Sequence, residues 1–129
     1  MCIRDRPIAS VEATAFVAGP DSQLHSQPSR AIAAALAKAG HEASELAAVE
    51  INEAFAAVGI QSTRELGIDP AIVNQHGGAI ALGHPIGASG ARIVGTLARQ
   101  LAEAGSGSLG AVGICGGGGQ GSAVVLRAL

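Results

Sequence analysis

The sequence has almost no aromatic residues and few charges. Of its 129 residues, two are phenylalanine and none is tryptophan or tyrosine, so the hydrophobic core has to be built from alanine, valine, isoleucine and leucine. Only 14% of the residues are charged, against roughly a quarter in an average soluble domain. A surface with so little charge indicates that another domain or subunit covers part of it.

Strong net charge, long apolar runs and paired cysteines are also missing. The formal net charge of -2 gives no electrostatic basis for binding nucleic acid or an anionic membrane surface, and we expect neither partner. No apolar run approaches the roughly 20 residues that cross a bilayer, and no secretory signal is visible. The two cysteines, Cys2 and Cys115, form neither a disulfide framework nor a Cys-x-x-Cys metal pair. These absences favour a reducing, cytoplasmic location.

The apolar periodicity alternates between strand-like and helix-like segments, within a length that suits one domain. Glycines end the helical segments, at Gly40, Gly67 and Gly105. The expected elements are strands at 8–17, 47–51, 109–114 and 122–127, helices at 28–39, at 53–66 and from 88 onward, and a short extended piece at 72–74. This order predicts an α/β fold in which a mixed sheet is packed between helices and ends in a β-hairpin.

A glycine-rich stretch at 74–90 stands between the second and third of these helices. Its five glycines allow tight turns and close backbone approach, so we expect an irregular loop. Pro85 follows His84 and restricts the backbone of that histidine. The loop therefore delivers His84 to the beginning of a helix, in the kind of segment that often carries chemistry.

Three segments place chemically useful side chains where strands end: Asn52, His84 and Cys115. A histidine, a cysteine and an asparagine at one sheet edge would form a general acid/base and oxyanion-binding set. A cysteine beside an imidazole and backbone N–H groups can also be held as a thiolate near neutral pH, well below its free pKa.

Each of these residues also has a purely structural interpretation. Cys115 alone could be a small buried hydrophobic residue at a strand end. His84 alone could bond a loop carbonyl, and Asn52 suits the N-cap of a helix that begins at Glu53. Taken singly, the sequence leaves these alternatives open.

Other motif interpretations fail on their context. Gly116, Gly118 and Gly121 match the spacing of a dinucleotide-binding fingerprint, but a strand follows them where that fingerprint needs a helix. The central stretch lacks the lysine of a phosphate-binding P-loop. A metal site made of His76, His84 and Cys115 has no familiar ligand spacing, and we expect no metal.

Taken together, three ordered motifs resemble the C-terminal half of the thiolase family, most closely its acetyl-CoA acetyltransferases. Residues 49–55 contain Asn-Glu-Ala-Phe, residues 77–92 read Gly-Gly-Ala-Ile-Ala-Leu-Gly-His-Pro-Ile-Gly-Ala-Ser-Gly-Ala-Arg, and residues 115–121 read Cys-Gly-Gly-Gly-Gly-Gln-Gly. The likeness covers nearly all of residues 7–129. The cysteine at position 115 separates the chain from the related ketoacyl synthases. By the family resemblance, those enzymes have a histidine in this role.

The resemblance implies a two-step acyl transfer between coenzyme A thioesters, with no tightly bound cofactor. Two acetyl-CoA would condense to acetoacetyl-CoA, or a 3-ketoacyl-CoA would be cleaved by the reverse thiolysis. By the family pattern, His84 activates the nucleophile and helps hold a thioester oxygen, and Cys115 is the acid/base at the α-carbon. Asn52 would position a water in the same oxyanion hole, and the backbone N–H of Gly117 would serve a second one. The family also implies a homodimer or homotetramer.

The family's nucleophilic cysteine belongs to an N-terminal half that the sequence does not match. We expect residues 1–6 to be a non-native leader and residues 7–129 to be the thiolase C-terminal domain. Cys2, within that leader, has no helix N-terminus beside it and does not replace the nucleophile. We therefore expect the chain alone to be inactive. The alternative is a non-catalytic thiolase-like module that binds acyl-CoA or a partner chain.

Overall fold

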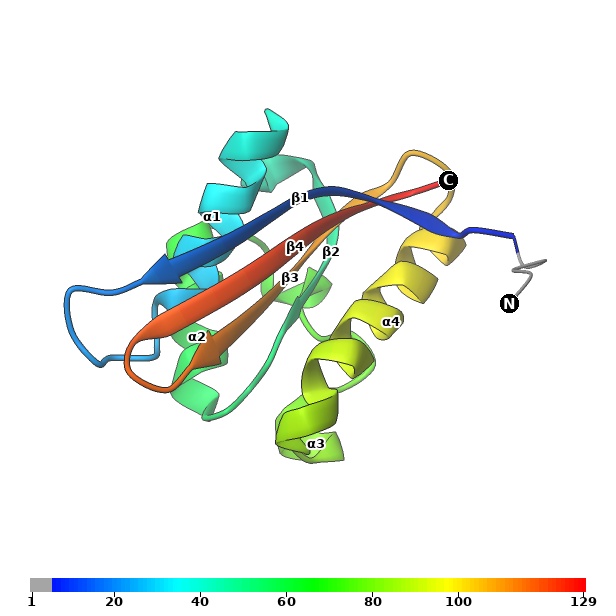
Figure 1. The fold of residues 1–129 in the computed structure, drawn as a ribbon. Coiled ribbons are helices and arrows are strands. Elements are labelled where there is room, and N and C mark those ends of the chain that lie inside the picture. Colours follow the sequence, from blue (N-terminus) through cyan, green and yellow to red (C-terminus); the bar gives the residue numbers. More distant parts are fainter. Residues whose placement is uncertain (1–5) are drawn as a thin grey trace, which may run out of the picture.

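The computed structural model describes residues 6–129, and the leader expected at residues 1–6 lies outside this range except for Arg6. Strands and helices alternate through the first half of the chain, and two further helices and a pair of strands follow (Figure 1). The helices and strands are β1 (Ala9–Ala18), α1 (Gln27–Ala39), β2 (Leu46–Ile51), α2 (Ala56–Leu66), α3 (Ala79–Leu82), α4 (Ile86–Ala104), β3 (Leu109–Gly116) and β4 (Gln120–Ala128), with single 3-10 turns at Ala43–Glu45 and Pro70–Ile72. No helix within residues 6–129 is long and apolar enough to cross a membrane.

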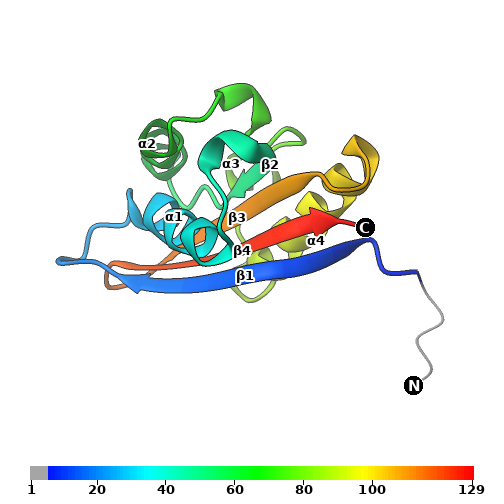
Figure 2. The same cartoon turned by 90° about the horizontal axis from the view of Figure 1, so that it is seen from above.

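The four strands form one mixed sheet in the order β1-β4-β3-β2. Figure 2 shows this order across the sheet, with β1 along one edge. β4 pairs antiparallel with both β1 and β3, whereas β2 and β3 run parallel, with Ile51 opposite Gly113. β3 and β4 form the predicted terminal hairpin. The mixed α/β sheet expected from the sequence is confirmed.

Helices cover both faces of the sheet and create two hydrophobic cores. α1 packs over β1, β3 and β4, and α2 packs against α1 on the same side. α4 packs on the opposite face, over β2, β3 and β4 (Figure 1). Because side chains alternate along a strand, Val49 and Ile51 of β2 enter the α1 core and Ala48 enters the α4 core. The sheet is thus packed between helices, as predicted.

In both cores, the helices pack closely against glycines of β3 instead of against large side chains. A Cβ atom on Gly113 would lie 2.8 Å from Ile32 Cδ1 of α1. A Cβ atom on Gly110 would lie 2.8 Å from Leu97 Cδ1 of α4, on the other face. Both helices therefore sit close to β3 because that strand carries no side chain at the crossing points.

The boundaries near the candidate site differ from those expected from the sequence. The second helix begins at Ala56 rather than Glu53, because the backbone N–H of Asn52 still donates to Gly113 O across the sheet (2.9 Å). The stretch expected to be an irregular loop contains a one-turn helix, α3, and α4 begins at Ile86, two residues early. The expected loop at 115–121 shrinks to a turn at 117–119, since β3 continues through Gly116.

Candidate active site

Asn52 lies directly after the C-terminal end of β2 and is completely buried. Its side-chain Nδ2 lies 3.5 Å from His84 Nε2, a long hydrogen bond. Its Oδ1 is buried and has no protein partner. The expectation that Asn52 caps a helix is wrong, since α2 begins four residues later, at Ala56. The amide oxygen is therefore the part of the Asn52 side chain left without a partner within residues 6–129.

His84 lies in the short segment between α3 and α4, and its side chain is exposed. Nε2 faces Asn52, and Nδ1 lies 2.7 Å from Ser89 Oγ in the first turn of α4. The imidazole thus bonds two side chains, so the alternative in which it serves a loop carbonyl is wrong. Ser89 is fully buried and was not singled out by the sequence analysis. Its only sequence signal is a hydroxyl side chain near the start of the helix that follows His84.

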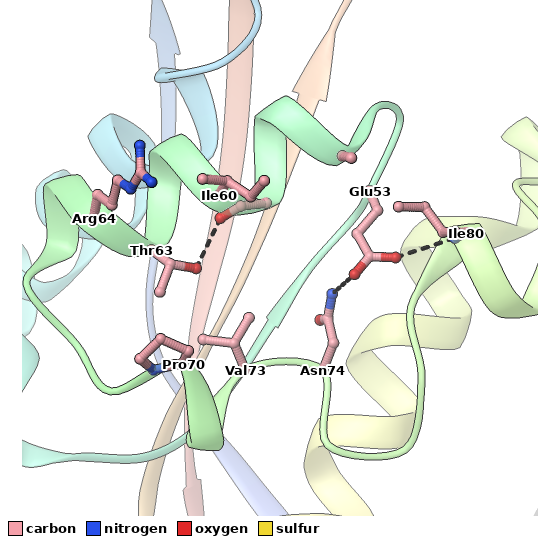
Figure 3. Close-up of a pocket in the computed structure, with 10 residues that line it drawn as sticks. Glu53, Ile60, Thr63, Arg64, Pro70, Val73, Asn74 and Ile80 are labelled. Carbon is pink, nitrogen blue, oxygen red and sulfur yellow. Dashed lines mark hydrogen bonds between the residues drawn. The ribbon is translucent and has the colours of Figure 1, made fainter.

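A polar clamp joins the end of β2 to the stretch that carries His84, and we define it as Glu53 and Asn74. Asn74 Oδ1 accepts from the backbone N–H of Ile51 (2.8 Å), and its Nδ2 donates to Ile51 O (2.9 Å) and to Glu53 Oε1 (2.9 Å). Glu53 Oε2 accepts from the N–H of Ile80 in α3 (3.1 Å). Figure 3 shows the Glu53 carboxylate between Asn74 and Ile80. The clamp thereby holds the chain on both sides of Asn52.

Two backbone features make the clamp possible. Asn74 has a left-handed backbone, with φ of 48°, which asparagine tolerates better than most residues. Gly78 lies against the clamp, and a Cβ atom there would overlap the Glu53 carboxylate. Gly78 therefore allows close approach to Glu53, in addition to any turn of the chain.

A hollow of about 410 Å³ lies beside the clamp, between α2 and α3 (Figure 3). Its walls include Glu53 and Asn74 together with the apolar side chains of Ile60, Val73 and Ile80. Asn52, His84 and Cys115 do not line it. This hollow is therefore separate from the candidate catalytic residues.

Cys115 is the second-last residue of β3 and pairs with Gly121 of β4. Its half-buried side chain packs against the core on the α1 side of the sheet. Burial raises the pKa of the Cys115 thiol above its usual value, although a backbone hydrogen bond opposes this shift. The expectation of a thiolate near neutral pH is therefore wrong for this structure, because burial favours the neutral thiol more strongly than the backbone hydrogen bond opposes it.

The structure brings two of the four predicted site residues into contact, and the other two, Cys115 and Gly117, make no hydrogen bond with them within residues 6–129. Asn52 and His84 contact each other, whereas no hydrogen bond joins His84 to Cys115 in residues 6–129. Cys115 lies at the same edge of the sheet as Asn52, on the adjacent strand. Gly117 is exposed in the β3–β4 turn, with open space around its Cα. Its predicted role as an oxyanion donor stays a prediction.

The polar groups nearby offer no metal site. Within residues 6–129 there is no cluster of three histidine, cysteine, aspartate or glutamate side chains that could hold a metal ion. Glu50 is buried on the α4 face of β2 and accepts a hydrogen bond from Gln100 Nε2 (3.1 Å), a contact that the sequence analysis did not foresee. Burial raises the pKa of Glu50. This contact ties α4 to the strand that ends at Asn52.

Comparison with known proteins identifies close relatives of the whole chain. The chain is 57% identical over 120 residues to a probable acetyl-CoA acetyltransferase of Mycolicibacterium smegmatis, covering 93% of this chain and 31% of the relative. It is 46% identical over 123 residues to the mitochondrial acetyl-CoA acetyltransferase A of Xenopus laevis, covering 95% of this chain and 29% of that protein. The chain thus spans about a third of the length of these relatives.

A solved structure and a family pattern agree with these relatives. The crystal structure of the Acat5 thiolase from Ascaris suum, in complex with coenzyme A, superposes with a TM-score of 0.89 at 44% identity, covering 98% of this chain and 32% of that one. Residues 5–128 match the family described as the thiolase C-terminal domain. Since that match covers nearly the entire sequence and carries the motifs around Asn52, His84 and Cys115, the chain belongs to the thiolase family.

Proposed function

We propose that this chain is the C-terminal domain of an enzyme that transfers acyl groups between coenzyme A thioesters. The reaction is the condensation of two acetyl-CoA to acetoacetyl-CoA, or the reverse thiolysis. The observation that carries the proposal is the contact between Asn52 Nδ2 and His84 Nε2, 3.5 Å apart at the end of β2. This pair could hold a thioester oxygen on which negative charge develops, His84 directly and Asn52 through a bound water.

In the proposed reaction, Asn52 and His84 form one oxyanion hole. Asn52 Oδ1, buried and without a protein partner, is placed to accept a hydrogen bond from a bound water. That water and a protonated His84 Nε2 would then donate to the thioester oxygen. In the acylation step, the same nitrogen takes the proton of the attacking cysteine thiol.

Cys115 acts as the second proton carrier. Because burial favours its neutral thiol, it begins with a proton to give, and it passes that proton to the sulfur of the departing coenzyme A. The resulting thiolate then removes a proton from the α-carbon of the second acetyl-CoA. The enolate attacks the acyl carbon, a carbon–carbon bond forms, and the nucleophilic cysteine leaves as a thiolate. The N–H of Gly117 would serve the oxyanion of this second step.

The nucleophilic cysteine has to come from other polypeptide. Cys115 is the only cysteine within residues 6–129, and Cys2 lies outside the described residues. The relatives are about three times as long as the region they share with this chain. We therefore propose that the purified 129-residue chain does not cleave acetoacetyl-CoA. Detectable thiolysis would show that the chain needs no cysteine from other polypeptide.

A domain exchange tests the function itself. Residues 7–129 would replace the matching region of the Mycolicibacterium smegmatis relative, with which they share 57% identity. We expect the chimera to cleave acetoacetyl-CoA, and expect His84→Ala and Cys115→Ala each to lower kcat by at least about 100-fold, as for loss of a proton-transfer group. His25→Ala is the matched control, since His25 is exposed and far along the chain from the site. A folded chimera without activity would refute the proposal.

The location and assembly of the enzyme are further proposals. Low charge and exposed apolar side chains on α3 and at the start of α4, Ile80, Leu82 and Ile86, support burial against more polypeptide. We propose a cytoplasmic enzyme that assembles as a homodimer or homotetramer. Light scattering of the chimera would test the assembly, and a monomer would contradict it.

A further inference from the structure

We propose that Ser89 is a positioning residue that keeps a proton on Nδ1 of His84, so that every proton exchange of this imidazole takes place at Nε2. The nitrogen left for exchange is the one that faces Asn52. The importance of this arrangement for catalysis rests on the proposed function, but the arrangement itself can be measured without any activity.

Ser89 is placed between two partners of different character. It lies in the first turn of α4 and is completely buried, so solvent does not compete for its hydroxyl. Its Oγ lies 2.7 Å from His84 Nδ1 and 3.1 Å from Pro85 O. Pro85 O can only accept a hydrogen bond, whereas an imidazole nitrogen donates or accepts according to its tautomer.

Counting hydrogen bonds decides between the two tautomers. If the hydroxyl donates to Pro85 O, its oxygen is free to accept from a proton on His84 Nδ1, and two hydrogen bonds form. If the hydroxyl instead donates to Nδ1, only one bond forms, and the oxygens of Ser89 and Pro85 face each other without a proton between them. The buried environment makes the lost bond costly. The Nδ1–H tautomer is therefore favoured.

The contact on the other side of the ring agrees with this tautomer. Asn52 Nδ2 is a donor, and it faces Nε2, which in the Nδ1–H form carries a lone pair. With the Asn52 amide oriented in this way, both neighbours of the ring favour the same proton position.

This arrangement suits a group that has to gain and lose a proton repeatedly. When Nε2 takes a proton, the Nδ1–H bond to Ser89 stays in place, so the ring keeps its orientation in both charge states. Without Ser89, the neutral ring could carry its proton on Nε2 and could not act as a base there. Fixing the tautomer through the second nitrogen is a general means of aiming an imidazole.

The test is the tautomer of His84, measured by two-dimensional NMR of the 129-residue chain with ¹⁵N-labelled histidine. Long-range couplings distinguish protonated from unprotonated ring nitrogens, and alkaline pH keeps the histidines neutral. The Ser89→Ala variant removes the hydroxyl at a helical position that alanine suits. Ser62→Ala is the matched control, because Ser62 is also a fully buried helical serine whose hydroxyl donates to a carbonyl, His25 O (2.8 Å).

We expect His84 to be mainly Nδ1–H in the wild type and in Ser62→Ala. In Ser89→Ala we expect the ratio of Nδ1–H to Nε2–H to fall at least about fivefold, the factor that corresponds to one hydrogen bond of about 1 kcal/mol. A wild-type His84 that is mainly Nε2–H would overturn the proposal whatever the variants do, and so would an unchanged ratio in Ser89→Ala. An inactive chimera with the expected tautomer would refute the function and leave this inference standing.

Discussion

The ends of β2 and β3 carry the two halves of the candidate site, and different forces hold them. The end of β2 is held by side-chain hydrogen bonds: the clamp of Glu53 and Asn74 ties it to α3, and Asn52 meets His84. The end of β3 is a hairpin held by close backbone packing. There Gly19 N donates to Gly119 O (2.7 Å), and a Cβ atom on Gly121 would overlap Gln27 O at the start of α1.

The difference matters for what each half can do. Polar side chains at the β2 end fix directions, which suits an oxyanion hole whose donors have to point at one place. Backbone packing at the β3 end buries Cys115 partly, and this burial raises the pKa of its thiol. The two ends should therefore respond differently to substitution, and the following experiments would sharpen or break this contrast.

The largest effect is expected at the hairpin. Gly121→Ala should lower the free energy of unfolding by about 3 kcal/mol, because its Cβ meets backbone that cannot move without shifting α1. Urea unfolding measures the loss. Gly95→Ala is the control, since Gly95 is exposed within α4 with open space around it, and it should raise stability by about 0.5–1 kcal/mol. Equal stability of Gly121→Ala and wild type would show that packing does not hold this end.

At the β2 end, Asn74→Ala should lower the free energy of unfolding by about 2 kcal/mol. The change removes three side-chain hydrogen bonds to Ile51 and Glu53 and leaves alanine in a left-handed backbone conformation. Gln75→Ala, next in the chain, removes one exposed hydrogen bond to Ala71 O and should change stability by less than about 0.5 kcal/mol. If the two variants lose equal stability in urea unfolding, the clamp is not what secures β2.

The reactivity of Cys115 tests the electrostatic side of the contrast. In a Cys2→Ser background, we expect iodoacetamide at neutral pH to alkylate the folded chain several-fold more slowly than the chain unfolded in guanidinium, to roughly the extent that burial depletes the thiolate. The rate should keep rising with pH beyond the ordinary cysteine pKa near 9.0, because burial raises the pKa of Cys115. Faster alkylation of the folded chain would mean that the hairpin end activates its cysteine.

The smallest effect concerns Glu50, on the strand that leads to Asn52. Burial raises the pKa of Glu50 in the folded chain, so between the ordinary glutamate pKa near 4.5 and the raised value the folded state holds more protons than the unfolded state. Stability from this group is therefore full below about pH 4.5 and is lost as pH rises through the folded pKa. Glu50→Gln should remove this decline and gain up to about 1 kcal/mol at neutral pH.

Unfolding of the wild type and of Glu50→Gln across acid to neutral pH would check this sign. Glu12→Gln is a suitable control, since Glu12 is exposed and faces Arg127 at 3.4 Å. That exposed pair should contribute well under about 1 kcal/mol. A stability of Glu50→Gln that falls relative to wild type as pH rises would contradict the prediction.

The order of elements and most of their boundaries could be predicted from the sequence. Glycines at 40, 67 and 105 end helices as expected, with φ values of 74°, 65° and 111°. Local rules suffice there because a helix end depends on the residues within one turn of it. The same rules failed at Asn52 and Glu53, which look like a helix start. Their hydrogen bonds go instead to Gly113, Asn74 and Ile80, residues more than 20 positions away.

By itself, then, the sequence determined the mixed α/β fold, the small-residue core, the family and three candidate site residues. Tertiary structure decided which of them meet. Asn52 and His84 come together through sheet register and the clamp, Ser89 turns inward to the imidazole, and the burial of Cys115 raises the pKa of its thiol. The physical reason is range: periodicity and glycine placement act between near neighbours in the chain, whereas hydrogen-bond partners and burial depend on segments that only packing brings together.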